Sequence, residues 1–148
     1  MNLNVRLPWD GNGDGIKDLY IASADTDEVL RYDGGTGAFL DVFVSRGAGG
    51  LDGPADLEFG PDGKLYVSGF EGNHVLRYDG STGAFLNVVA SGIPGPIGLT
   101  FGSNGDLYIE SHFGSQVFRY DGSKLSIYSP PILVSNGLIH SEMQNVLA

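Results

Sequence analysis

The chain of 148 residues contains 24 glycines and 7 prolines, and so many residues of low helix propensity exclude a helical bundle. It contains no cysteine, which excludes disulfides, zinc–thiolate sites and cysteine nucleophiles. Eighteen acidic against eight basic residues give a net charge of −10, which disfavours nucleic acid as a partner, and no stretch approaches the roughly 20 apolar residues that span a membrane.

The first feature along the chain is an aspartate-rich loop, residues 10–18, with the sequence DGNGDGIKD. Side-chain oxygens stand at its first, third, fifth and ninth positions, Gly15 permits a sharp turn, and Ile16 is placed to offer its carbonyl. This is the ligand spacing of a calcium-binding EF-hand loop. An EF-hand would also need a bidentate glutamate at the position that Ile21 occupies here.

The loop is similar instead to the calcium sites of integrin α-subunit (FG-GAP) repeats, in which D-x-[DN]-x-D-G-x-x-D precedes a hydrophobic strand. That resemblance implies a structural Ca²⁺ ion between the first and second strands of the chain. The implied ligands are the side chains of Asp10, Asn12, Asp14 and Asp18 and the main-chain carbonyl of Ile16. The alternative is an ordinary turn without an ion, like FGPDGK at 59–64 and FGSNGD at 101–106.

An internal repeat organises most of the chain. VLRYDGGTGAFL at 29–40 matches VLRYDGSTGAFL at 75–86 in eleven of twelve positions, and VFRYDGS follows at 117–123. The arginines of these segments, Arg31, Arg77 and Arg119, are 46 and 42 residues apart. Such a period indicates a repeat architecture. The shared Arg-Tyr-Asp is expected to be structural, with the arginine pairing to turn carboxylates or carbonyls and the tyrosine packing between repeats.

Each repeat is predicted to form four short strands separated by turn residues. In the second repeat these are ADLEF (55–59), KLYVSG (64–69), HVLRYD (74–79) and AFLNVVA (84–90). Four antiparallel strands in 42 to 46 residues are typical of a β-propeller blade. The chain is therefore predicted to be all-β, with residues 1–129 forming three blades at about 5–46, 53–91 and 95–129.

The segments GPADLEFGPDGKLYVSG and GPIGLTFGSNGDLYIES resemble blades of bacterial NHL-like and gluconolactonase-like propellers. The resemblance implies a ring of more than three blades, so we expect two chains to form one six-bladed ring as a homodimer. The alternative is that the missing blades belong to a longer chain. Residues 130–148 depart from the repeat, and we expect them to cap or latch the subunit junction, or to be a disordered end.

Catalytic candidates are few. The loops that frame a propeller funnel carry mainly acids: Asp25, Asp27, Glu28, Asp52 and Glu71. Gluconolactonase-like enzymes hold a catalytic metal with Glu, Asn and Asp, for which Glu58 and Asn73 are the nearest counterparts, without a matching motif. Streptogramin lyase-like propellers use a histidine base, for which His112 or His74 would serve. Glu58 and His112 are thus the candidates, and neither has a recognisable partner.

The sequence therefore predicts a non-catalytic binding or interaction module that is stabilised by calcium and assembles with itself. Its further ligand, a small molecule, a glycan or a protein, is not identified by any motif. The alternative is a metal-dependent hydrolase or lyase, lactonase-like, with an acidic central funnel. No signal peptide is recognisable, and the compartment is left open, although the family resemblance leans towards an extracellular one.

Overall fold

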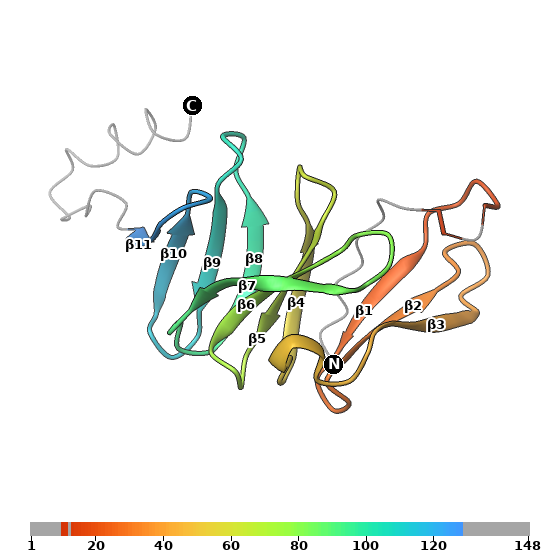
Figure 1. Cartoon of the computed structure of the whole chain (residues 1–148), viewed down its shortest axis with the longest axis horizontal. Helices are drawn as coiled ribbons and strands as arrows, with labels where there is room; N and C mark the ends of the chain where they lie inside the picture. The colour runs from red at the N-terminus through yellow and green to blue at the C-terminus, as the bar shows by residue number, and fades with distance from the viewer. Residues whose placement is uncertain (1–9, 12, 129–148) are drawn as a thin grey trace, which may run out of the picture.

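The computed structural model describes residues 10, 11 and 13–128, which form three antiparallel sheets that lie side by side (Figure 1). Blade one consists of β1 (Leu19–Ser23), β2 (Glu28–Tyr32) and β3 (Phe39–Val44). Blade two consists of β4 (Pro54–Phe59), β5 (Leu65–Gly69), β6 (His74–Tyr78) and β7 (Phe85–Ser91). Blade three consists of β8 (Pro96–Phe101), β9 (Leu107–Ser111), β10 (Gln116–Tyr120) and β11 (Leu125–Tyr128).

This arrangement confirms the predicted fold class of antiparallel, blade-like sheets. Strand order within blades two and three follows chain order, and the predicted strands of the second repeat agree with β4 to β7 to within one residue at either end. The strand that would open blade one, at 5–9, and the predicted cap at 130–148 lie outside the described residues. A short 3₁₀ turn, η1 (Ala48–Gly50), lies in the linker between blades one and two. No helix that could cross a membrane occurs in the described part of the chain.

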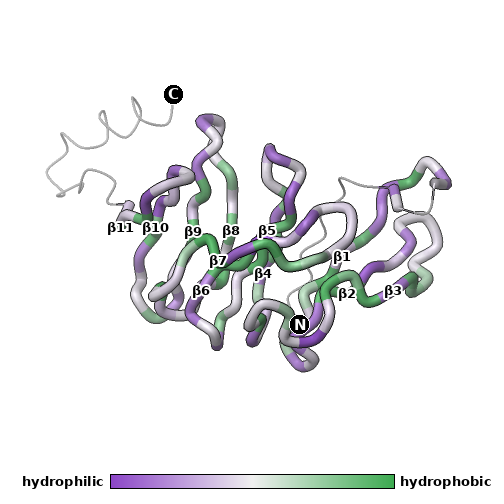
Figure 2. The backbone as a smooth tube through the Cα atoms, viewed as in Figure 1, coloured by the Kyte–Doolittle hydropathy of each residue, from purple (hydrophilic) through white to green (hydrophobic). Residues whose placement is uncertain are grey.

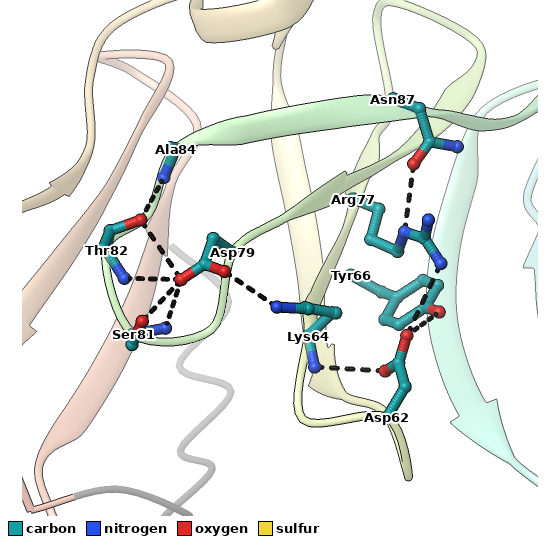
Figure 3. Close-up of polar contacts among 9 residues, drawn as sticks. All are labelled: Asp62, Lys64, Tyr66, Arg77, Asp79, Ser81, Thr82, Ala84 and Asn87. Atoms are coloured by element: carbon teal, nitrogen blue, oxygen red, sulfur yellow. Dashed lines mark hydrogen bonds and ion pairs between the residues drawn. The ribbon is translucent and has the colours of Figure 1, made fainter.

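The repeated aspartate after each Arg-Tyr closes the hairpin to the outermost strand. In blade two, Asp79 Oδ1 accepts hydrogen bonds from the backbone N–H groups of Ser81 and Thr82, at 3.0 and 3.1 Å, while Lys64 Nζ lies 2.8 Å from Asp79 Oδ2 (Figure 3). The bond from Lys64, with those from Ser81 and Thr82, holds the pKa of the Asp79 carboxyl well below its usual range. The same side-chain capping recurs at Asp33 and, in a shorter turn, at Asp121.

The repeated arginine is held by polar groups of its own blade. Arg77 Nε donates to Asn87 Oδ1 at 3.0 Å, and its Nη1 lies 3.5 Å from Asp62 Oδ2, which also accepts the hydroxyl of Tyr66 (Figure 3). The expectation that the repeated arginine pairs with turn carboxylates or carbonyls is confirmed for Arg77, with Asp62, and for Arg119, with Asp106 of the β8–β9 connection. Arg31 pairs instead with Asp41 of β3, and its Nη1 lies 3.6 Å from Oδ2 of Asp18, the residue that matches Asp106 in the repeat.

Each blade has two apolar faces because its strands alternate side chains between them. One, the tyrosine face, carries Tyr20 on β1, Tyr66 on β5 or Tyr108 on β9. The other, the leucine face, carries Leu19, Leu65 or Leu107 from the same strands. Apolar residues lie mainly within the strands and polar ones at the connecting loops (Figure 2).

Two hydrophobic clusters join the blades through unlike faces. Between blades one and two, the tyrosine face of blade one packs on the leucine face of blade two; the buried members include Tyr20, Val29, Phe43, Leu65, Val67 and Leu76. Between blades two and three, the same pairing joins Tyr66, Val75 and Ala90 to Leu99, Leu107 and Ile109. Tyr78 is fully buried in the first cluster, and its hydroxyl donates to the carbonyl of Ala48 in the linker at 2.8 Å. Burial raises the pKa of this phenol well above its usual range.

One turn of each blade holds the linker that leads to the next blade. This turn is β1–β2 in blade one and β5–β6 in blade two. Asp27, at a φ of 57°, accepts the N–H of Gly47 with its carbonyl and that of Gly53 with Oδ1, at 3.0 and 2.9 Å. Asn73, at a φ of 55°, does the same for Ile93 and Gly95, at 3.1 and 2.9 Å. A side-chain oxygen and a left-handed backbone are both needed, and Asn and Asp supply both.

This linker clamp leads to a first prediction. Replacing Asn73 with alanine removes the bond to Gly95 and places a Cβ-bearing residue without compensation in the left-handed region. We expect the free energy of unfolding to fall by about 1–2 kcal/mol, measured by urea denaturation. Asn73→Asp is the matched control, because Asp27 performs the same task in blade one, and it should lose less than half as much. Equal losses in both variants would contradict the clamp.

Candidate functional site

The aspartate-rich loop wraps around the carboxylate of its first residue. Asp10 Oδ1 accepts the N–H groups of Gly13 and Asp14 at 2.6 and 3.1 Å, and Asp10 Oδ2 accepts that of Gly15 at 2.7 Å. Asp14 Oδ1 accepts the N–H of Ile16 at 2.7 Å. These bonds organise the loop as a compact turn with its carboxylates close to the backbone.

The last residue of the loop, Asp18, has a fully buried side chain. Its Oδ2 accepts the N–H of Gly11 at 3.0 Å and lies 3.6 Å from Nη1 of Arg31. Its Oδ1 is buried and accepts no hydrogen bond from the described residues. A buried carboxylate oxygen in this state is costly unless a cation or a donor reaches it.

Of the predicted calcium ligands, Asp10, Asp14, Ile16 and Asp18 lie in the described part of the chain, and Asn12 lies outside it. Among the residues that the structure describes, no three Asp, Glu or His side chains converge as metal ligands would. The oxygen of Asp18 is the feature that suits a cation, whereas the nearby guanidinium of Arg31 already neutralises part of the charge.

A second candidate is an acidic hollow of about 500 Å³ formed by loops of all three blades. Its carboxylates come from the β1–β2 turn, the linker to blade two and the β5–β6 turn: Asp25, Asp27, Asp52 and Glu71. The side chains of Phe70 and Ile97 form its apolar wall. Four of the five acids expected at this end of the blades therefore line one hollow, and Glu28 does not.

Neither catalytic candidate is among the residues that line this hollow, although His112 lies against its wall residue Phe70. Glu58 is nine-tenths buried on β4, opposite Tyr66 of β5, and lines neither of the two main hollows of the described chain. His112 is exposed in the β9–β10 turn, where its ring lies 6.0 Å from that of Phe70 and 5.0 Å from that of Phe113. His74 is half-buried, and burial lowers the pKa of its imidazole. The structure does not bring these residues together in one site.

A third candidate, the open hollow, has a volume of about 620 Å³ and lies on the tyrosine face of blade three. Gly98, Tyr108, Glu110 and Val117 form its floor, and His112 lies at its edge. In blades one and two this same face is covered by the next blade. The hollow is therefore the position that a further blade would occupy.

Asp56, a functional residue of the fold that the sequence analysis passed over, joins blades two and three. Its Oδ2 accepts the N–H of Leu99, at 2.7 Å, in the innermost strand of blade three, while its Oδ1 accepts that of Leu57 at 2.8 Å. The group is 5% exposed, so the bond crosses the interface in a dry setting. The available signal was the pair of acids, Asp56 and Glu58, inside the strand ADLEF.

Comparison with solved structures supports this fold assignment. The chain is similar to a selenomethionine-substituted virginiamycin B lyase from Staphylococcus aureus, with a TM-score of 0.62 and 18% identity over 78% of this chain and 39% of that one. It is similar to a catalytically inactive virginiamycin B lyase from the same organism with quinupristin, with a TM-score of 0.62 and 18% identity over 86% and 41%. A streptogramin B lyase structure matches with a TM-score of 0.61 and 18% identity over 78% and 38%.

These likenesses establish a β-propeller-type fold. The chain spans about two fifths of the length of the structures it resembles. No family model matches the chain, and no curated protein does. The NHL-like character and the FG-GAP-like calcium loop therefore stay predictions from the sequence.

Proposed function

We propose that the protein is a non-catalytic β-propeller interaction module whose ring is completed by a second copy of the chain. The observation that carries the proposal is the pair of unlike faces at the two ends of the blade row. Leu65 and Leu76 on the leucine face of blade two are fully buried, whereas Leu19 and Leu30 at the same positions of blade one are only partly so. At the other end, the tyrosine face of blade three is open.

Two copies satisfy both faces at once. A two-fold axis would place the tyrosine face of each blade three on the leucine face of its partner's blade one, which makes two equivalent contacts and a ring of six blades. Each contact would repeat a pairing that already joins neighbouring blades within the chain. Further blades within a longer polypeptide would satisfy the same faces, and the mass of the particle distinguishes the two arrangements.

The mass measurement is the second prediction. Size-exclusion chromatography with light scattering should give a particle of twice the chain mass of 15.6 kDa, unchanged on tenfold dilution from micromolar concentration. A uniform particle at the chain mass would contradict self-completion of the ring. Higher, concentration-dependent masses would indicate open head-to-tail chains instead of a closed pair.

We further propose that the aspartate-rich loop holds a structural calcium ion. Asp18 supports this, because the ion would supply the positive charge that its buried Oδ1 lacks among the described residues. Asp10, Asn12 and Asp14 would be the remaining side-chain ligands and Ile16 the main-chain ligand. When bound, the ion would neutralise carboxylates that otherwise repel one another, so its contribution would be to stability and not to chemistry.

Calcium dependence is the third prediction. A chelator should lower the melting temperature of the protein, and added Ca²⁺ should restore it, because an ion that binds only the folded state stabilises it. Asp14→Ala should abolish this response. Asp25→Ala, which removes an exposed carboxylate outside the loop, is the matched control and should leave the response unchanged. A melting temperature insensitive to the chelator would leave the loop an ordinary turn.

A lyase is the second candidate function, favoured by the fold likeness to virginiamycin B lyase together with the acidic hollow. Neither Glu58 nor His112 is among the residues that line that hollow, which supports a binding role. Any ligand of the hollow would be a small molecule, glycan or protein that carries cationic or hydroxyl groups, since four carboxylates line it.

The two functions separate in a turnover assay, which is the fourth prediction. Quinupristin and gluconolactone, incubated with the protein and followed by mass spectrometry, should remain unchanged over the buffer control. Turnover of quinupristin that His112→Ala abolishes, or of gluconolactone that Glu58→Gln abolishes, would overturn the non-catalytic assignment.

A further inference from the structure

The tyrosine face of blade three repeats a surface that the chain covers elsewhere. Val29, Val75 and Val117 occupy one position of the repeat, on the strand after the tyrosine. Val29 and Val75 are 0% exposed, whereas Val117 is 36% exposed. Removing an aliphatic side chain from water stabilises the packed state in proportion to the apolar area buried. Covering the tyrosine face of blade three would therefore bury Val117, as Val29 and Val75 are already buried on the two covered faces.

The ring contacts of the repeated tyrosine show what kind of surface covers this face. Tyr20 meets the edge of Phe59 at 5.1 Å between centroids, and Tyr66 meets Phe101 at 5.0 Å, both at steep angles. In each case the phenylalanine ends the innermost strand of the next blade. Tyr108 instead contacts Tyr128 of its own outermost strand, at 5.4 Å. The fitting partner is thus the innermost strand of another blade.

Blades two and three each carry a carboxylate on the tyrosine face, but on different strands. On blade two, Asp56 of the innermost strand supplies the carboxylate for the next blade, and Ser68 beside it accepts the N–H of Asp56 at 2.9 Å. The corresponding residues of blade three are Gly98 and Glu110. The carboxylate has moved from the innermost strand to its neighbour.

Geometry supports this exchange. A Cβ built on Gly98 would lie 3.1 Å from Oε2 of Glu110, so the Glu110 carboxylate occupies the space over Gly98 that a side chain would fill. Glu110 is exposed on the floor of the open hollow, whereas Asp56 is buried under blade three. Glu110 is therefore placed to accept a backbone N–H from an incoming innermost strand, as Asp56 does from Leu99.

We propose that the open hollow of blade three is the docking site for a second copy of this chain, and that Glu110 is its anchoring acceptor. This inference rests on the proposed self-completion of the ring and names the surface and the atom that perform it. Blade one of the second copy is the occupant, because its leucine face is the kind of surface that covers the tyrosine faces of blades one and two.

An exchange of residues tests the proposal, and the dimer dissociation constant from sedimentation velocity is the measurement. Glu110→Ser removes the acceptor from both equivalent contacts of the dimer and should weaken it about a hundredfold, because each charge-assisted hydrogen bond contributes about tenfold. The double variant Gly98→Asp with Glu110→Ser rebuilds the arrangement of Asp56 and Ser68, and its affinity should return to within about threefold of the original. Val117→Asp places a charge on the same face and should abolish the dimer.

The outcomes separate this inference from the proposed function. A wild-type dimer whose affinity none of these variants changes would place the contact elsewhere, overturning the docking site but not the assembly. A Glu110→Ser defect that the double variant fails to repair would overturn the exchange of carboxylates. A wild-type monomer would overturn the assembly and the docking site together. Melting curves of each variant, expected to retain a cooperative transition because Glu110 and Val117 are exposed, check that the blades still fold.

Discussion

The structure depends on one constraint: a blade of this repeat has two apolar faces and cannot bury either of them alone. Blade two is the only described blade with a neighbour on each side; accordingly its strand β5 is wholly buried, and β6 is buried at Val75, Leu76 and Tyr78. The packing is directional, since a tyrosine face always meets a leucine face. Because the blades stack in a row, the two ends of the described row leave one face of each kind, and these two faces are complementary.

Polar groups set the positions of the blades once the apolar faces meet. The Asp56 carboxylate fixes the innermost strand of blade three, while Asp27 and Asn73 hold the linkers that lead from one blade to the next. Each of these bonds satisfies a backbone N–H that would otherwise be left without a partner near an interface. The repeated arginines and turn aspartates act within their own blades, which explains why Arg-Tyr-Asp recurs without forming a site.

The candidate sites follow from the same arrangement. The acidic hollow forms where the linkers and turns that Asp27 and Asn73 hold meet, at one end of the strands. Its four carboxylates therefore come from segments far apart in the sequence. The open hollow lies on the tyrosine face of blade three, which no other described blade covers.

The sequence by itself determined the all-β class, the repeat, the strands of each blade and the hairpin turns, since these depend on local alternation and on Gly and Asp at turns. It also indicated the acids at one end of the blades, because the repeat places the same loop there each time. It did not reveal the contacts of Asp56 and Asn73 or the exchange of carboxylate between Gly98 and Glu110, nor which of the candidate residues line the hollows of the described chain. Those features depend on which faces and loops meet across blade boundaries, and only the tertiary structure brings residues so distant in the chain into contact.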